Sequence, residues 1–412
     1  MANDNGNGQN LSGRMIEDRF GNRQYTLDAL REKATQQFLD EISGRADILQ
    51  ELNTPAKKRD AIAEAVDYVL AVQYVTVTSV EKLWLVDRIY RDIFRLGPLD
   101  TLLSDPTVTE ISITGPTEVA ARRGFGELER WSGEFEDSDH LNLLIATALT
   151  PFGIDTSNPT LETAIQLGGR ALRFSLMGPP IMPFYNGLIR LHPAAPLTLA
   201  ALAIPTIARD LLQKIIAGGH GLLIVGEGGM GKTTLLSHLL GYAQTNSALV
   251  QRGHEIHPSR IPATMTDYTE MPKTEHPTAV FERRLHEALN QKPTAVFVDE
   301  IQGDEGGSFW RLLTSGVQCV VTFRGKTNAA RIHSALSMAI RKVHPILDQP
   351  DIDAALQRAL PFVLIVSQVT PHTIPRIVQL GQWVADGKSF EALIEWDGEE
   401  PHRTDVIPCR NL

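Results

Sequence analysis

The stretch LLIVGEGGMGKTT, residues 222–234, decides the fold of the C-terminal half of this 412-residue chain. Its first four residues form an apolar run typical of a buried strand, and Leu235–Leu240 has the apolar character of a helix. The segment between them has the pattern G-x-x-x-x-G-K-T, in which glycines let the backbone wrap a phosphate chain at a helix N-terminus. The sequence therefore predicts a nucleoside triphosphate site, where Lys232 reaches the β- and γ-phosphates and Thr233 offers its hydroxyl to Mg²⁺.

The same letters contain G-x-G-x-x-G, at Gly226, Gly228 and Gly231, which is also the pattern of a dinucleotide-binding loop. Two features favour the triphosphate. A Lys-Thr pair directly follows the third glycine, and neither a dinucleotide loop nor a structural turn needs that pair. The second predicted strand ends in Gln251 and Arg252 rather than in an acid that binds ribose.

An acidic pair follows another apolar run downstream. Ala295–Val298 predicts a buried strand, and Asp299 and Glu300 come directly after it. Such carboxylates can hold the water shell of Mg²⁺ and orient an attacking water, although an acidic pair alone is as compatible with a helix cap. Its place after the phosphate loop in one domain favours the functional interpretation. We predict that Thr233, Asp299 and Glu300 bind magnesium, directly or through water, and that Lys232 and Glu300 are catalytic.

The pattern of apolar residues divides the chain into regions. Helical spacing dominates up to Phe94, short apolar runs separated by Gly and Pro follow from Gly97, and two prolines interrupt residues 192–196. The predicted organisation is a disordered tail at 1–24, a helical unit at 25–96, an α+β domain at 97–192, a linker at 193–200 and a P-loop domain at 201–412.

Strand-like runs alternate with helical segments in the last of these regions. The runs are Leu222–Val225, Ala248–Val250, Ala295–Val298, Cys319–Thr322 and Phe362–Val366. This alternation is typical of a parallel, doubly wound sheet. The fold class is therefore α/β, with a RecA-like P-loop domain behind an α+β domain.

Composition narrows the class of protein. The formal net charge is −10, which argues against a domain that coats nucleic acid. The two cysteines, Cys319 and Cys409, cannot build a disulfide framework or a four-ligand zinc site, and this favours a reducing compartment. The N-terminus lacks the basic start and apolar core of a signal peptide, and no apolar run approaches the length of a membrane span. We expect a cytoplasmic protein whose membrane contact is peripheral.

From Leu96 to the C-terminal region the chain resembles the traffic ATPases of the secretion superfamily, which serve type II and type IV secretion systems. Within that superfamily it looks most like the CpaF/TadA-like pilus-assembly branch. The resemblance rests on LGPL at 96–99, DPTVTEI at 105–111, RRG at 122–124 and EL at 127–128, which precede the phosphate loop in this order.

The resemblance implies further site residues. The segments GGR at 168–170 and LIR at 188–190 match positions at which arginines of the N-terminal domain fold over the ATP phosphates. Arg170 and Arg190 are therefore expected to neutralise charge in the transition state, with ordinary surface arginines as the alternative. The acidic box of the family corresponds to QRGHE at 251–255, where Glu255 alone remains as a catalytic carboxylate.

Two other family boxes also depart from the pattern. The arginine after the acidic pair is replaced by Gln302, and the histidine box is replaced by TFRGK at 322–326. A guanidinium cannot act as a neutral relay, but Arg324 can still clamp phosphate. The predicted nucleotide-binding residues are thus Gly226, Glu227, Gly228, Gly229, Met230, Gly231, Lys232, Thr233, Thr234 and Arg324. We predict retained ATP binding with slow or partner-dependent hydrolysis.

What the resemblance implies about function is a ring, hexameric by family analogy, that binds ATP and Mg²⁺ and drives pilus assembly or secretion. The implied partner is an inner-membrane platform protein, and the implied location is the cytoplasmic face of the membrane, without direct nucleic-acid contact. Two alternatives stay open: an ATPase of conjugative DNA transfer, and a nucleotide-binding scaffold with impaired hydrolysis.

Overall fold

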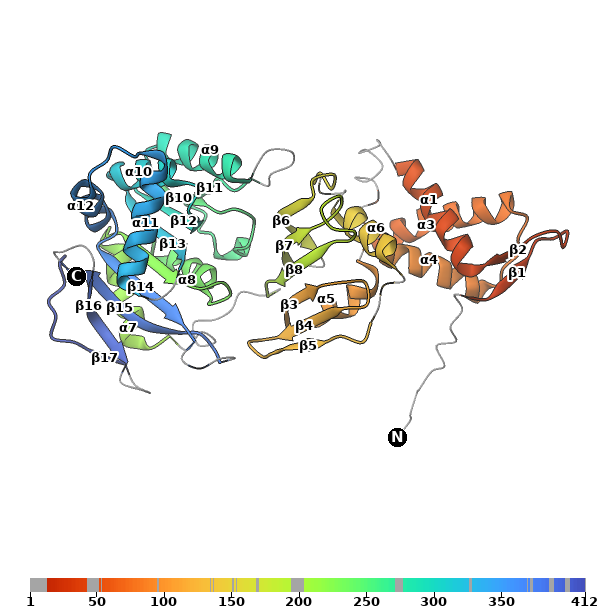
Figure 1. The fold of residues 1–412 in the computed structure, drawn as a ribbon, viewed down its shortest axis with the longest axis horizontal. Coiled ribbons are helices and arrows are strands. Elements are labelled where there is room, and N and C mark those ends of the chain that lie inside the picture. Colours follow the sequence, from red (N-terminus) through yellow and green to blue (C-terminus); the bar gives the residue numbers. More distant parts are fainter. Residues whose placement is uncertain are drawn as a thin grey trace.

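Three groups of elements follow one another along the longest axis of the molecule (Figure 1). In this computed structural model the described residues are 13–411 without 43–51, 53, 95, 134, 136, 150–151, 153, 168–169, 194–203, 271–276, 326–327, 369, 371–372, 385–388 and 397–400. The predicted linker at 193–200 therefore lies, apart from Pro193, outside the described residues. No described helix is both long and apolar enough to cross a membrane.

The N-terminal group is a small helical unit. It contains the strands β1 (Met15–Glu17) and β2 (Gln24–Thr26) and the helices α1 (Leu27–Ile42), α3 (Pro55–Val72) and α4 (Ser79–Phe94). The helices bury one apolar stripe each, centred on Leu30, Ile62 and Ile89. The β1–β2 pairing corrects the expectation of a disordered tail through residue 24, because the chain already pairs with itself from Met15.

The middle group is an α+β domain built on an antiparallel sheet. Its elements are η1 (Gly97–Leu99), α5 (Asp100–Ser104), β3 (Val108–Ile113), β4 (Val119–Arg123), β5 (Leu128–Arg130), α6 (Ser138–Leu149), β6 (Thr160–Leu167), β7 (Arg170–Met177) and β8 (Asn186–Leu191). The strand order is β5-β4-β3-β8-β7-β6. Leu172, Phe174 and Leu176 of β7 join the core that α6 also contributes to. Because side chains alternate along a strand, Arg173 points to the opposite face.

The C-terminal group contains a nine-stranded sheet. Six strands are parallel to one another: β9 (Leu222–Gly226), β10 (Ser247–Val250), β11 (Met265–Asp267), β12 (Ala295–Ile301), β13 (Gln318–Arg324) and β14 (Phe362–Ser367). An antiparallel extension adds β15 (Arg376–Trp383), β16 (Phe390–Trp396) and β17 (Pro401–Arg403). The order is β11-β10-β12-β13-β9-β14-β15-β16-β17.

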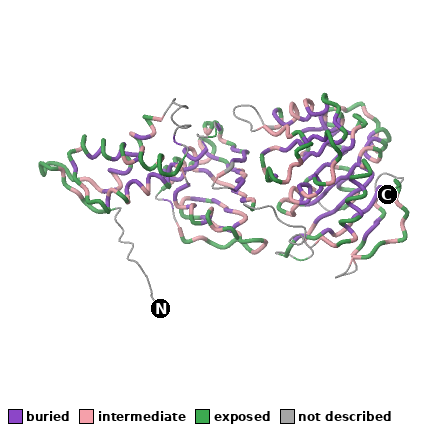
Figure 2. Tube along the Cα trace, turned by 180° about the vertical axis from the view of Figure 1, so that it is seen from behind, coloured by how far each residue is buried: buried purple, intermediate pink, exposed green. Residues whose placement is uncertain are grey.

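Helices cover both faces of this sheet, where they build two hydrophobic cores. In Figure 2 the tube through the middle of this group is coloured as buried. They are α7 (Thr206–Ala217), α8 (Lys232–Leu239), α9 (Pro277–Asn290), α10 (Gly306–Thr314), α11 (Ala329–Val343) and α12 (Gln349–Ala359), with the short helices η3 (Leu240–Tyr242) and η4 (Pro258–Arg260). The predicted parallel α/β sheet is confirmed. Strand β13 lies between β9 and β12, which gives the RecA-like order and brings the carboxyl ends of these three strands together.

Candidate nucleotide-binding site

The glycine-rich loop joins β9 to the N-terminus of α8. Gly229 and Gly231 have φ values of 79° and 80°, a region that L side chains rarely adopt, so the turn requires glycine at both positions. Lys232 is buried, and its Nζ donates a hydrogen bond to the carbonyl of Glu227 across the loop at 2.8 Å. The loop thus has the form that backbone N–H groups and one ammonium need to hold a phosphate chain.

Asp299 meets this loop from the end of β12. Its Oδ2 accepts a hydrogen bond from Thr233 Oγ1 at 2.9 Å, and its Oδ1 accepts one from Thr322 Oγ1 at 2.8 Å. Burial, with the nearby charges of Glu255 and Glu300, raises the pKa of Asp299 to about 7. A hydroxyl and a carboxylate at this separation are hard oxygen donors that fit Mg²⁺, which keeps several waters and takes few protein ligands.

Glu300 sits at an irregularity of β12. Its φ is 61°, and the register with β13 shifts between Val298 and Ile301. The backbone N–H of Glu300 therefore leaves the ladder and donates to Thr322 Oγ1 at 2.7 Å. A left-handed, non-glycine residue in a buried strand is strained, and such strain concentrates at functional sites.

A guanidinium from the α+β domain closes the site. Nη1 of Arg173 lies 2.7 Å from Oε2 of Glu300 and 3.1 Å from Oε1 of Glu255. Burial alone raises the pKa of Glu300, but the charges of Arg173 and of Lys232 outweigh it, so this pKa lies below its ordinary value. Glu255 is also within 3.3 Å of His192 Nε2. The predicted carboxylates Glu255 and Glu300 therefore lie in one cluster.

Arg190 and Arg324 flank the glycine-rich loop from two domains. A Cβ added to Gly228 would lie 3.1 Å from Nη2 of Arg190 and 3.5 Å from Cζ of Arg324, so both guanidinium groups lie directly against the loop backbone. Arg190 has one loose ion pair, 3.7 Å from Nε to Glu110. The side chain of Arg324 has no hydrogen bond or ion pair among the described residues. Both guanidinium groups are thus available to an anion at the loop.

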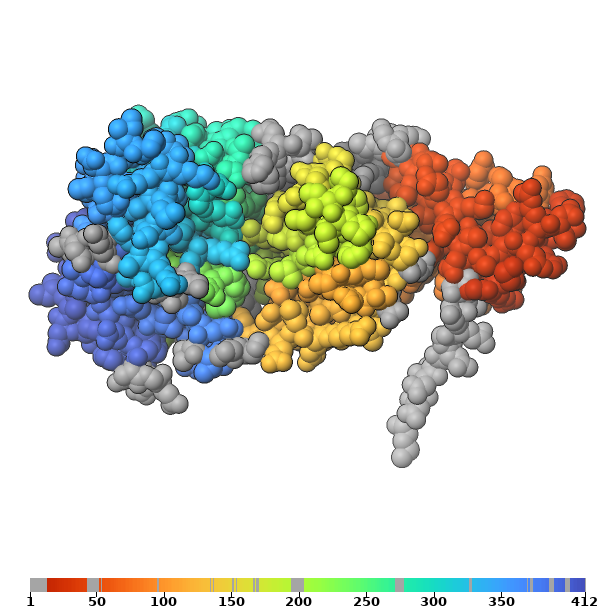
Figure 3. All heavy atoms as spheres, in the orientation of Figure 1, coloured from red at the N-terminus to blue at the C-terminus, as the bar shows by residue number. Residues whose placement is uncertain are grey.

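The loop opens into a cleft between the α+β and C-terminal domains, which Figure 3 shows in contact. A cavity of about 300 Å³ is lined by residues 228–234 of the loop and, from the other domain, by Thr109, Arg122 and Phe125. A larger neighbouring cavity of about 690 Å³ continues past Arg252 and Gln302. A charged ligand at the loop would therefore touch both domains.

The prediction for Arg170 is wrong. Arg170 is buried at the start of β7, and its guanidinium donates to the carbonyls of Leu103, Asp105, Val108 and His192 at 2.6–3.3 Å. Those bonds lie within the α+β domain, so the side chain cannot reach the phosphate loop. Arg173, three residues further along β7 and therefore on the opposite face of the sheet, occupies the place that we expected for Arg170. Strand pairing puts it directly opposite Arg190.

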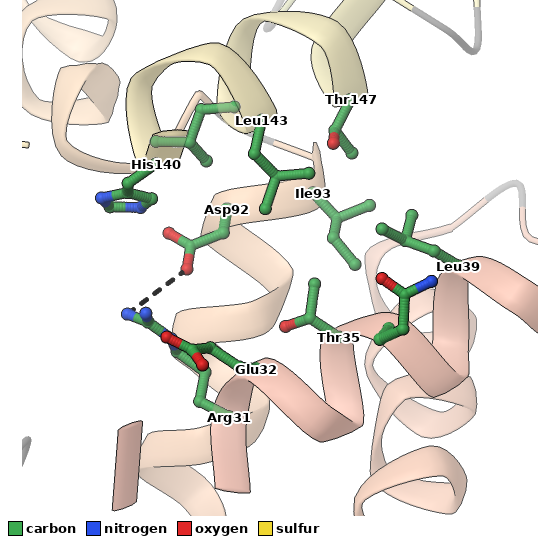
Figure 4. A pocket seen from close by; sticks show the side chains of 11 residues that line it. Arg31, Glu32, Thr35, Leu39, Asp92, Ile93, His140, Leu143 and Thr147 are labelled. Carbon is green, nitrogen blue, oxygen red and sulfur yellow. Dashed lines mark ion pairs between the residues drawn. The ribbon is translucent and has the colours of Figure 1, made fainter. Parts of the chain in front are cut away.

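A separate cavity of about 160 Å³ lies where the helical unit meets the α+β domain (Figure 4). Helices α1, α4 and α6 line it, and Arg31 and Asp92 form an ion pair of 3.9 Å at its wall. Asp28 lies 3.7 Å from the same guanidinium. The arginine charge is balanced there, and the cavity has no part in the phosphate chemistry.

The fold and the loop define the class: a RecA-like P-loop domain that follows an α+β domain in the sequence. No known family model matches the chain. Over 233 residues it is 29% identical to proteins named for conjugal transfer in two strains of Mycobacterium tuberculosis, which covers 53% of this chain and 66% of each relative. The chain therefore spans slightly less than two thirds of their length. An uncharacterised protein of Methanocaldococcus jannaschii is 25% identical over 57% of this chain and 43% of its own.

Solved structures with a similar fold come from secretion and pilus systems. The VirB11 ATPase of the Brucella suis type IV secretion system is 19% identical, with a TM-score of 0.37 over 71% of this chain and 96% of that one. The Legionella pneumophila ATPase DotB is 14% identical, with a TM-score of 0.48 over 70% and 80%. The pilus retraction motor PilT with bound ADP is 15% identical, with a TM-score of 0.49 over 71% and 84%.

Proposed function

We propose that this chain is an ATPase that binds Mg-ATP at residues 226–234 and couples the nucleotide to the position of its α+β domain. One observation carries the proposal: the buried Asp299 and the partly buried Glu300 face Lys232 and Thr233 across a cleft that Arg173 of the other domain closes. This set holds a cation site, a carboxylate that can orient water, and positive charge for the phosphates.

Each side chain has a role in this proposal. Lys232 exchanges the carbonyl of Glu227 for the β- and γ-phosphates. Thr233 and Asp299 would hold Mg²⁺, which when bound offsets phosphate charge.

Glu300 orients the attacking water, and Glu255 supports it through the Arg173 guanidinium that they share. Arg190 and Arg324 neutralise the γ-phosphate.

We further propose that the chain belongs to the secretion-superfamily traffic ATPases and works as a ring, hexameric by analogy, at the cytoplasmic face of the membrane. The order of motifs from Leu96 to the phosphate loop supports the superfamily and the CpaF/TadA-like branch. Its work would be pilus assembly or secretion with an inner-membrane platform protein. Mechanical work would come from domain positions that differ in their affinity for ATP and ADP.

A second candidate is an ATPase of conjugative transfer, and the names of the mycobacterial relatives favour it. Both candidates share the same site and differ only in the exported cargo. A gene neighbourhood with pilins and a prepilin peptidase would favour the first, and one with a relaxase and a coupling protein would favour the second.

A third candidate is a nucleotide-binding scaffold that hydrolyses ATP poorly. The replacements at Gln302 and Arg324 motivate it, together with the proposal that hydrolysis is slow or depends on a partner. Two variants separate scaffold from motor. Lys232→Ala removes nucleotide binding, whereas Glu300→Gln removes the carboxylate that orients water. Assembly that fails with the first variant and persists with the second identifies a scaffold, and equal failure identifies a motor.

The direct test is ATPase turnover measured against oligomeric state, with and without lipid and the platform protein. We expect slow turnover for the isolated chain and faster turnover in the assembled ring. Turnover that is as fast for the chain alone as with its partners would contradict the partner dependence. An absence of turnover in every state would contradict the hypothesis that the chain is a motor.

A further inference from the structure

The backbone of Glu300 does not pair with a neighbouring strand, and the side chains of Thr322 and Arg252 bond to its N–H and its carbonyl instead. Thr322 accepts from its N–H at 2.7 Å, and Nε of Arg252 donates to its carbonyl at 3.1 Å. Buried backbone groups need such partners because a lost hydrogen bond there is expensive. The left-handed geometry at φ 61° is therefore held from both sides by residues of neighbouring strands or of the segments that follow them.

Arg252 is itself fixed by contacts outside the cluster of Glu300, Glu255 and Arg173. Its Nη2 donates to Oε1 of Glu305, and its guanidinium stacks over the Phe281 ring, 4.5 Å from the centroid. Glu305 is fully buried, and its Oε2 accepts from the N–H of Gln302 at 2.8 Å. One guanidinium, that of Arg252, thus contacts both Glu300 and Glu305, the two ends of the 300–305 segment.

We propose that Arg252 is a positioning residue, which with Glu305 braces the 300–305 segment so that the Glu300 carboxylate faces the phosphate loop. This rests on the proposed ATPase function. The planar guanidinium fork allows Nε and Nη2 to serve two acceptors at once, which a lysine ammonium does with less geometric control. Gln251-Arg252 stands where the acidic box of the family is expected. Arg252 supplies a positive charge there in place of the expected negative charge, and the proposal gives that charge a role.

An ordinary buried ion pair is the competing interpretation. Arg252 would then only compensate the charge of Glu305, and removing both charges together would leave hydrolysis unchanged. If Arg252 positions the 300–305 segment, removing both charges should change hydrolysis, because the carbonyl of Glu300 loses its donor even when Glu305 is neutral. The two interpretations therefore differ in what a double variant does.

The experiment uses the full chain with Arg252→Met and Glu305→Gln together. Methionine still packs on Phe281 but donates nothing, and glutamine still accepts from Gln302 without leaving a buried charge unpaired. We expect ATP affinity within about threefold of the parent chain and turnover lower by about tenfold to a hundredfold. Amide exchange of residues 299–303 should become faster. Arg252→Lys alone should keep the fold and recover part of the turnover.

The control is Arg311→Met, on the exposed face of α10, where the side chain bonds only to Asn290 among the described residues. It should leave turnover and exchange at the parent values. Unchanged turnover or unchanged exchange in the double variant overturns the brace. If the parent chain does not hydrolyse ATP, the proposed function fails instead, and the exchange of residues 299–303 alone then decides whether Arg252 holds this segment.

Discussion

Arg173 of the α+β domain lies 2.7 Å from Glu300 of the P-loop domain, and this contact joins a catalytic candidate to a separately folded part of the chain. The same guanidinium contacts Glu255 at 3.1 Å. These two ion pairs connect the carboxylates of the P-loop domain to the α+β domain. A phosphate at the loop competes for the same positive charge, which provides a route from nucleotide state to domain position.

Replacing Arg173 with glutamine tests this contact through pH. Glu300 must be ionised to orient water, and Arg173 is the group that most lowers its pKa against the effect of burial. Without the guanidinium, burial dominates and the pKa of Glu300 rises. Turnover measured across the acidic range should therefore begin to fall at a higher pH in the variant than in the parent. Identical acidic limbs would contradict the role of Arg173.

Alanine variants of Arg170 and Arg190 should differ in their effects, because the first should lower stability and the second should weaken nucleotide binding. Arg170→Ala leaves several buried carbonyls without a donor, so we expect a loss of roughly 3 kcal/mol in the free energy of unfolding. Arg190→Ala should unfold like the parent and bind ATP about tenfold more weakly. Urea unfolding and ATP titration of both variants check this, and the reverse pattern would restore Arg170 to the site.

Arg324 offers a test of the replaced histidine box. If its fixed charge neutralises the γ-phosphate, Arg324→Ala should lower turnover by about tenfold or more. Arg324→His should act only while protonated, so its turnover should decline as the pH rises through about 6.5, unlike that of the parent. A histidine variant with the parent's pH dependence would show that the charge at this position is unnecessary.

The sequence was a good guide wherever one local pattern determines the outcome. Apolar runs predicted β9, β12 and β13, and their parallel order brings Thr233 and Asp299 within 2.9 Å. It was a poor guide to Arg173, because that placement depends on strand register and on how two domains meet. The alternation of Arg173 with the buried Leu172 and Phe174 was the available signal. The left-handed backbone of Glu300 has no local sequence signature at all.

The most direct test of the account is calorimetry of ATP with Mg²⁺ on the full chain and on Lys232→Ala. We predict saturable heat of association for the parent at millimolar nucleotide or below, and loss of that heat in the variant, whose circular dichroism should match the parent. No heat from the parent, or equal heat from both proteins, would contradict the claim that residues 226–234 hold the triphosphate.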